Sequence, residues 1–443
     1  PDARTDRAAE EGDGAARAQG RAVKLRALGV AALAILAGCS GIHGGTNPKA
    51  PLWEARPGWV IDVVFRRELT ALSQVSAKAG VERGVPAIDP RHARVFVGSS
   101  DHGLYALRAT DGSVLWRYQT AGSVMSEPLY DESRDLVYFG SDDDGLYAVH
   151  ASNGELVFRY RTGAEVQRRP VIVARDKRSI LVFDNAADSI FAIDADTGAP
   201  VWKHQRNPAL GLEVAGHAGV AYGNDRIYVA FSTGAVTAYD IDTGVERWPE
   251  INLAAPTTAG DDVQKFLDVD TTPIVRGDRV FVANVGTGVY ALDAQSGTSI
   301  WKRPEATAVS WLAQWNEPAH TDHDSGAQVP EMSLLLAGSG TTGLWALDPK
   351  SGEIRWRKST PRGSLSYPVA IQGALLVTSS KLGLFLLEPR SGAVIDGLDP
   401  DSGFSGGAAA FGGKAYVLTN GGMLLGLEVA PPAEKMRSTR ASY

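Results

Sequence analysis

The sequence predicts an all-β fold, an eight-bladed β-propeller whose blades are four-stranded antiparallel sheets. A strand–turn–strand stretch at residues 103–116 (GLYALRATDGSVLW) recurs along almost the whole chain, at residues 145–158, 189–202, 235–248, 288–301, 343–356 and 383–396. Its turn glycines are spaced by 42, 44, 46, 53, 55 and 40 residues, the range typical of propeller blades. These glycines are Gly112, Gly154, Gly198, Gly244, Gly297, Gly352 and Gly392.

Each repeat unit contains four short apolar segments separated by turns. In the first unit they are residues 85–88, 94–99, 104–107 and 114–117, and the second unit repeats the order. Consecutive strands joined by short turns pair antiparallel, so each unit is expected to be a four-stranded meander. The third segment is apolar on both of its alternating faces, so both sides of each sheet must be covered. Sheets stacked face to face around an axis satisfy this requirement.

The turn and the strand after it carry recurrent residues with structural explanations. An aspartate such as Asp194 or Asp293 can cap the turn, and the glycine takes a left-handed conformation without steric cost. A tryptophan recurs four residues after the glycine, and we interpret it as a docking residue that buries its ring between blades. These tryptophans are Trp116, Trp202, Trp248, Trp301 and Trp356.

The last repeat copy, at residues 423–428, lacks its fourth strand, because the chain becomes polar after it. An unpaired apolar segment at residues 59–64 stands before the first unit. We expect this N-terminal strand to complete the last blade and close the ring. The propeller then spans residues 58–430, followed by a C-terminal tail at 431–443. Seven blades is the alternative if one unit is degenerate.

The N-terminal segment has the features of an export signal. Residues 23–26 (VKLR) are basic, and the apolar run at 27–38 is too short to span a membrane but suits a signal peptide. The run ends in LAGC, which resembles a lipobox, and Cys39 is the only cysteine in the chain. We predict an upstream extension and lipoprotein signal peptide at 1–38, lipidation at Cys39 and a lipidated tether at 39–57. The alternative is an ordinary signal peptide with an incidental cysteine.

Composition argues against one class of partner. The chain has 44 basic and 51 acidic residues, for a formal net charge of −7. Binding of nucleic acid would call for a clustered basic face, which the sequence does not show. No nucleic-acid partner is therefore expected.

The repeat pattern LYALDxxTGxxxW resembles that of pyrroloquinoline-quinone (PQQ) dehydrogenases and of the BamB family of outer-membrane assembly lipoproteins, over roughly residues 50–430. The lipobox, the eight units and the segment FLDVDTTPIV at 266–275 favour the BamB family. The resemblance implies a non-catalytic scaffold, anchored in the outer membrane and facing the periplasm, since Ser40 rather than aspartate follows the cysteine. Its implied partners are the POTRA domains of BamA, the other assembly lipoproteins and nascent outer-membrane proteins.

The resemblance also implies which residues contact BamA. Asp268 and Asp270 match one docking loop, and Leu210 and Leu212 match a second, although Glu213 stands where the family has arginine. The strand order alone places both segments on neighbouring connections on one face of the ring, and long connections often carry function. The alternative is that the two aspartates only support the following strand.

Two other functional classes remain open. One is a PQQ-dependent quinoprotein dehydrogenase, and the other a periplasmic ligand-binding or sensor propeller. We identify no catalytic constellation and expect no cofactor and no metal site. An insert at 316–326, expected on the face opposite the Asp268 loop, contains potential metal ligands, but a solvated loop explains them better: His320, Asp322, His323 and Asp324. Trp311 and Trp315 before it are interpreted as packing residues.

Overall fold

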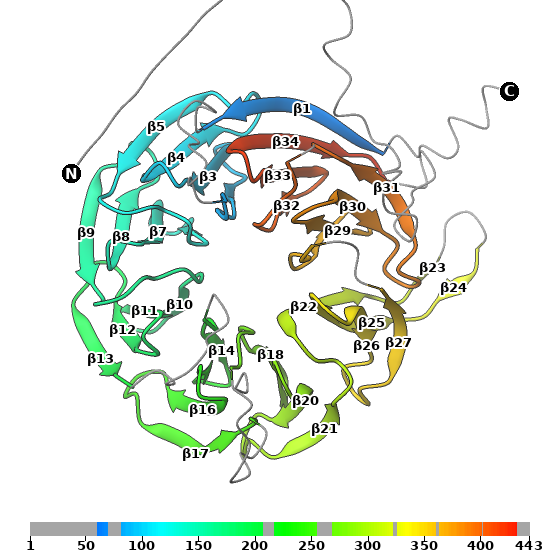
Figure 1. The fold of residues 1–443 in the computed structure, drawn as a ribbon. Coiled ribbons are helices and arrows are strands. Elements are labelled where there is room, and N and C mark those ends of the chain that lie inside the picture. Colours follow the sequence, from blue (N-terminus) through cyan, green and yellow to red (C-terminus); the bar gives the residue numbers. More distant parts are fainter. Residues whose placement is uncertain are drawn as a thin grey trace, which may run out of the picture. The chain divides into compact units, whose positions relative to one another are not determined.

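The computed structural model describes residues 60–69, 81–206, 217–254, 268–321, 326–359, 363–400 and 402–431. These residues form strands β1 to β34 and no helix, and eight four-stranded antiparallel sheets are arranged as blades around an axis (Figure 1). The prediction of eight blades is confirmed, and the seven-blade alternative is wrong. Residues 1–59 and 432–443, which include the predicted signal peptide, Cys39 and the tail, lie outside the described residues.

Within each blade the first strand lies nearest the axis and the fourth forms the outer edge (Figure 1). The strands, from the inside outwards, are β2–β5 (Ala87–Asp89, Arg94–Gly98, Gly103–Arg108, Val114–Gln119), β6–β9 (Leu129–Asp131, Leu136–Ser141, Gly145–His150, Leu156–Arg161), β10–β13 (Val171–Ala174, Ser179–Asp184, Ile190–Asp194, Pro200–His204), β14–β17 (Ala221–Gly223, Arg226–Ala230, Ala235–Asp240, Glu246–Asn252), β18–β21 (Ile274–Arg276, Arg279–Asn284, Gly288–Asp293, Ser299–Arg303), β22, β25, β26 and β27 (Val309–Glu317, Met332–Ser339, Gly343–Leu347, Ile354–Lys358), β28–β31 (Val369–Ile371, Ala374–Ser379, Gly383–Leu387, Val394–Leu398) and β32, β33, β34 and β1 (Ala409–Phe411, Lys414–Leu418, Met423–Val429, Ile61–Glu68).

The apolar third strands form the centre of each sheet, as their sequence predicts. In blade 1, Ala106 of β4 pairs with Phe96 of β3 on one side and with Trp116 of β5 on the other. Ala106 and Phe96 are both fully buried, because the neighbouring blade covers the sheet face. The core is therefore divided into clusters between successive blades.

The N-terminal strand closes the ring. β1 pairs antiparallel with β34, from Ile61 opposite Val429 to Glu68 opposite Met423, and so supplies the missing fourth strand of blade 8. Its start is fixed by Asp396 of blade 7, whose Oδ2 accepts hydrogen bonds from the backbone N–H of Val60 (2.7 Å) and of Ile61 (3.1 Å). Asp396 is fully buried and stands four residues after Gly392, where other blades carry the recurrent tryptophan.

The recurrent tryptophans contact the next blade in a repeated way. The indole N–H of Trp116 donates to the carbonyl of Ala151 (3.0 Å), and a Cβ on Gly154 would lie 2.7 Å from the Trp116 ring. The same hydrogen bond recurs from Trp202 to Ile241 (2.8 Å), from Trp301 to Pro349 (3.2 Å) and from Trp356 to Pro389 (2.7 Å). The turn glycine thus does two things: it adopts a positive φ and leaves room for the ring.

Four blades depart from this pattern, and in blade 7 Asp396 takes the place of the aromatic residue. The Trp248 ring packs against Gly297, but its Nε1 is buried and has no hydrogen-bond partner in the described part of the chain. Aromatic rings without a donor take the place of tryptophan at Phe158 in blade 2 and Phe65 in blade 8. In the seven blades with an aromatic residue at this position, packing of the ring on a glycine of the next blade is therefore the shared contact, and four of them add the hydrogen bond.

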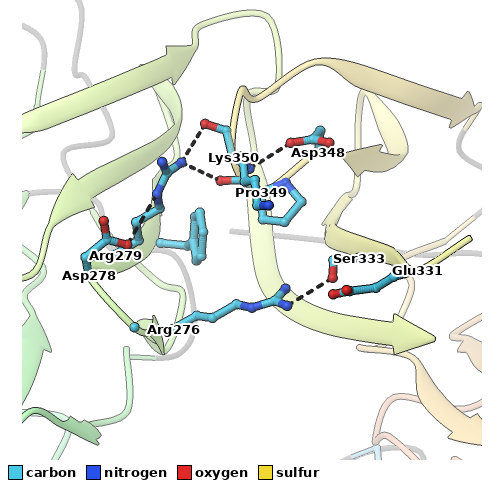
Figure 2. Close-up of a pocket in the computed structure, with 10 residues that line it drawn as sticks. Arg276, Asp278, Arg279, Glu331, Ser333, Asp348, Pro349 and Lys350 are labelled. Atoms are coloured by element: carbon cyan, nitrogen blue, oxygen red, sulfur yellow. Dashed lines mark hydrogen bonds and ion pairs between the residues drawn. The ribbon is translucent and has the colours of Figure 1, made fainter. Parts of the chain in front are cut away.

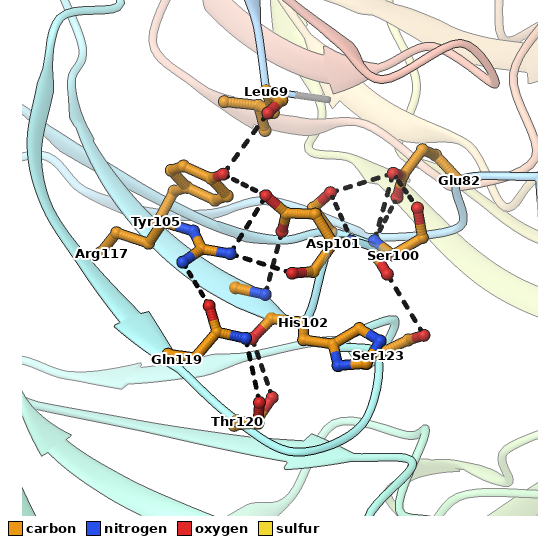
Figure 3. A network of polar contacts seen from close by, with 12 residues as sticks. Leu69, Glu82, Ser100, Asp101, His102, Tyr105, Arg117, Gln119, Thr120 and Ser123 are labelled. Carbon is orange, nitrogen blue, oxygen red and sulfur yellow. Dashed lines mark hydrogen bonds and ion pairs between the residues drawn. The ribbon is translucent and has the colours of Figure 1, made fainter. Parts of the chain in front are cut away.

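The entry into blade 1 is fixed by a polar network around two carboxylates (Figure 3). Glu82 accepts from the hydroxyl of Ser99 (2.9 Å) and from the backbone N–H of Ser100 (2.9 Å). Asp101 accepts from the Tyr105 hydroxyl and pairs with Arg117 at 3.2 Å, and this guanidinium covers the Tyr105 ring at 5.2 Å. A cation one residue after the docking aromatic covers a third-strand ring in four further blades, as Arg159 over Tyr147, Lys203 over Phe191, Lys302 over Tyr290 and Arg357 over Trp345.

Candidate partner-docking site

One face of the ring carries every connection from a fourth strand to the first strand of the next blade, because the strands alternate in direction. Two neighbouring connections contain the residues that the resemblance assigned to partner binding. Residues 207–216, with Leu210, Leu212 and Glu213, lie between β13 and β14 and are outside the described residues. Residues 255–267, between β17 and β18, are outside them as well, but the aspartates that follow are described.

Asp268 and Asp270 lie at the base of their connection, directly before β18. Both side chains are buried, with 1% and 5% of the residue surface exposed. The carbonyl of Asp268 accepts from Asn284 Nδ2 (3.1 Å) and from the backbone N–H of Val285 (3.0 Å), which fixes the connection to β19 and its turn. This geometry favours the alternative that the pair supports the chain beneath the face rather than presenting carboxylates at its surface.

Arg168, just before β10, joins the bases of both connections. Its Nε donates to the carbonyl of His217 (2.5 Å), and its Nη2 donates to the carbonyl of Asp270 (3.4 Å). A third contact, from the backbone N–H of Gly219 to Thr272 Oγ1 (3.0 Å), links the same two bases directly. The two connections are therefore held side by side by residues of three successive blades. We call this set of contacts the joint.

Burial governs the charges around this joint. It lowers the pKa of His217 to about 3, with the Arg168 cation contributing in the same direction. Burial also raises the pKa of the Asp184 carboxyl well above its usual value. His217 Nε2 lies 3.6 Å from Asp184 Oδ2, but because burial favours the neutral form of each, we do not count this contact as an ion pair. The two bases are held together by hydrogen bonds to two carbonyl groups and one hydroxyl rather than by an ion pair between His217 and Asp184.

A channel runs beside the joint along the inner strands. Two adjoining cavities of about 500 and 350 Å³ share five lining residues: Glu127, Arg168, Ser310, Trp311 and Tyr367. The Arg168 Nη1 lies 3.8 Å from the Glu127 carboxylate, whose pKa is raised by burial although Arg168 and Arg169 oppose the shift. Arg168, which joins the two connections, thus also lines the place where the two cavities adjoin.

Among the described residues, one group has the side chains for a metal ion: Asp89, His92 and Asp135. Arg94 occupies its centre, since its Nε donates to Asp89 (2.7 Å) and its guanidinium also pairs with Asp135. A fixed cation in this position disfavours a metal ion. In the insert, His320 is exposed, whereas Asp322, His323 and Asp324 lie outside the described residues.

The insert lies between β22 and β25, the first and second strands of blade 6, and therefore on the face opposite the connections, as the sequence predicts. Trp311 and Trp315 of β22 are buried in the cluster between blades 6 and 7, which agrees with their interpretation as packing residues. The short strands β23 (His320–Thr321) and β24 (Gln328–Val329) project beyond the outer edge of the ring (Figure 1).

Sequence reasoning missed Arg168 and His217. The only available signal is the pair Arg168-Arg169 before β10, since the second blade has Ser126-Glu127 at the corresponding place. Nothing in a single sequence indicates that this arginine reaches two later connections.

The closed ring, its repeat and its docking aromatics define a β-propeller built from PQQ-like repeats. The family model described as outer membrane protein assembly factor BamB matches residues 66–135, 133–314 and 288–430. The chain belongs to this family.

Individual relatives give the same assignment. The outer membrane protein assembly factor BamB of Legionella pneumophila is 26% identical over 208 residues, which are 47% of this chain and 49% of that protein. The chain thus spans about half the length of this curated relative. The crystal structure of BamB from Moraxella catarrhalis superposes with a TM-score of 0.64 at 16% identity, covering 83% of this chain and 100% of that one, which shows the shared fold.

A more distant similarity extends to an enzyme. The quinohemoprotein alcohol dehydrogenase ADH-IIG of Pseudomonas putida is 28% identical over 207 residues, which are 40% of this chain and 27% of the enzyme.

The described part of the chain contains no helix with the length and apolarity needed to cross a bilayer.

Proposed function

We propose that this protein is a non-catalytic scaffold lipoprotein of the outer-membrane β-barrel assembly machinery, which docks on the POTRA domains of BamA. The family assignment supports a role in outer-membrane protein assembly. The main support for the docking site is the joint at Arg168, because its hydrogen bonds bring the bases of two long neighbouring connections together on one face.

In this proposal the two connections form one docking surface. Leu210 and Leu212 supply its apolar contacts, and apolar anchors commonly dominate the binding energy of an interface. Asp268 and Asp270 act from beneath, because their burial suits them to fix the second connection rather than to meet a partner directly. Lipidation at Cys39 anchors the protein to the outer membrane on its periplasmic side, beside the other assembly lipoproteins.

The outer strands suggest how the scaffold assists its clients. β5, β9, β13, β17, β21, β27 and β31 are the edges of their sheets. An edge strand offers backbone groups to an extended segment, so nascent barrel strands could pair there transiently.

Capture from membranes tests the assembly role. The tagged protein is isolated from solubilised outer membranes, with and without crosslinking, and BamA is sought among the captured proteins. Absence of BamA from both captures contradicts the proposal. A Cys39→Ser variant should leave the membrane fraction, and its retention there argues against the lipid anchor.

Binding to purified POTRA domains tests the surface. Simultaneous Leu210→Ala and Leu212→Ala substitution should weaken binding at least about tenfold, the effect of losing a principal contact. Val245→Ala is the matched control, because Val245 is an exposed apolar residue in a turn on the opposite face and should bind like wild type. Equal affinity of the double variant and wild type means that the surface is assigned wrongly.

The dehydrogenase alternative has its own test. The protein is incubated with PQQ and calcium, and alcohol-dependent reduction of a dye is measured. Turnover would refute the scaffold function, whatever the result with BamA.

A further inference from the structure

A cleft of about 550 Å³ lies between blades 5 and 6, on the face opposite the candidate docking site (Figure 2). One wall is formed by Arg276 at the end of β18 and Arg279 at the start of β19. The other consists of Glu331 and Ser333 on the insert side of blade 6 and the turn at 348–350. The volume lies within the range of small-molecule sites, about 300–1,000 Å³.

Two charged groups of the cleft are already engaged, Arg279 in a contact between the two blades and Asp348 in contacts within blade 6. Arg279 Nη1 donates to the carbonyls of Pro349 (3.0 Å) and Lys350 (2.5 Å). The Asp348 carboxylate accepts from the backbone N–H of Lys350 (2.8 Å) and from Arg355 Nη2 (2.6 Å). Neither Arg279 nor Asp348 is therefore available as the main contact of a ligand.

Arg276 is differently placed. Its Nη2 donates to Ser333 Oγ (3.0 Å), whereas its Nη1 is buried and has no hydrogen-bond partner within the described ranges (Figure 2). Leaving a charged donor buried and unpaired is costly, so a bound acceptor is favoured. Ser333 accepts from Arg276 and keeps its own hydroxyl hydrogen to donate. Lys350 is exposed at the edge of the cleft and adds a second cation.

The neighbouring blade pair shows that the repeat does not require this arginine. Between blades 4 and 5, Arg226 makes the same clamp as Arg279, with Nη1 donating to the carbonyl of Ala294 at 2.9 Å. The position equivalent to Arg276 is Gly223, the last residue of β14, and a Cβ there would lie 2.5 Å from Val275. That space is filled, and the space between blades 5 and 6 is open.

We propose that this cleft binds the phosphate group of a phosphorylated small molecule or lipid headgroup. Arg276 Nη1 and the Ser333 hydroxyl lie next to each other, because Arg276 Nη2 is 3.0 Å from Ser333 Oγ, and Lys350 lines the same cleft, so the cleft offers several donors to an oxyanion. The volume leaves room for the rest of the ligand beside the phosphate. The Glu331 carboxylate at the rim repels the anion and therefore weakens its binding. The segment that follows the insert of blade 6 then has a role, because it supplies Glu331 and, at the start of β25, Ser333.

Titration calorimetry of the full chain with glycerol 3-phosphate and with inorganic phosphate tests the site. Arg276→Gln should weaken binding of glycerol 3-phosphate by about tenfold to a hundredfold, the effect of losing a charged hydrogen bond. Ser333→Ala should weaken it less, and Glu331→Gln should strengthen it. The matched control is Arg175→Gln, since Arg175 lies on the same face but is already paired with Asp225 (2.8 Å) and Asp242 (3.1 Å).

Cosedimentation with phosphatidylcholine vesicles, with and without phosphatidylglycerol, separates the two sources of phosphate. Binding that depends on both phosphatidylglycerol and Arg276 assigns a lipid headgroup, and binding of glycerol 3-phosphate without vesicle binding assigns a soluble ligand. The proposal is overturned if no probe binds wild type, if Arg276→Gln and Ser333→Ala both bind like wild type, or if Arg175→Gln weakens binding as much as Arg276→Gln. A urea midpoint equal to that of wild type shows that each variant is folded.

Discussion

Substitution of Gly297 by alanine should destabilise the ring for two separable reasons. Gly297 has φ of +74°, and its Cβ would lie 2.3 Å from Cε3 of the buried Trp248. A left-handed non-glycine residue costs about 1–2 kcal/mol. Displacing a packed ring costs about 1–3 kcal/mol. The expected loss of unfolding free energy is therefore about 2–5 kcal/mol.

Gly163→Ala isolates the first of these costs. Gly163 has φ of +81°, but its Cβ would meet no atom within 4 Å, so only the backbone cost of about 1–2 kcal/mol is expected. Urea unfolding is followed by far-UV circular dichroism and by fluorescence, and the two transitions must coincide before a free energy is derived. If Gly297→Ala is no more destabilising than Gly163→Ala, the packing argument is refuted. In a Trp248→Ala background the excess cost of Gly297→Ala should disappear, which a double-mutant cycle measures.

Three further predictions concern the other polar contacts. Asp396→Ala removes the acceptor of three backbone N–H groups, those of Val60, Ile61 and Gly397, and the loss of the two at the start of β1 alone should cost about 2–6 kcal/mol. Hydrogen exchange at residues 60–61 should accelerate, and unchanged exchange contradicts the closure role. Burial opposes ionisation of Asp240, but hydrogen bonds from Arg247 and a threonine lower its pKa to about 2. Since this pKa lies below the unfolded value of 3.8, the destabilisation by Arg247→Gln should be full above pH 3.8 and vanish as pH falls towards about 2, and a pH-independent loss refutes the pairing. Arg168→Met should accelerate exchange at residues 217–219 and 270–272, whereas Arg169→Met, on an exposed neighbour, should not; equal effects argue against the joint.

The ring was predictable because its determinants are local. Gly112 and its equivalents need a positive φ at a tight turn, and each tryptophan stands at a fixed distance from its glycine. Both are visible in a stretch of 14 residues such as 103–116. The missing fourth strand of the last unit likewise leaves residues 59–64 as the available partner, and β1 takes that place.

The candidate site was only partly predictable. The resemblance identified Asp268 and Asp270, but their burial depends on atoms from other blades. Whether a carboxylate meets a partner or supports the chain beneath cannot be read from its neighbours in sequence. Leu210 and Leu212 rest on the resemblance alone.

The sequence by itself determined the number of blades, the order of the strands and the face on which each connection emerges, because these follow from short-range turn and pairing rules. Only the tertiary structure decided the long-range contacts. Asp396 holds Val60 across 336 residues of chain, and Arg168 joins the bases of two later connections. The open cleft at Arg276 exists because the blades repeat imperfectly, and that imperfection becomes visible only when neighbouring blades are packed.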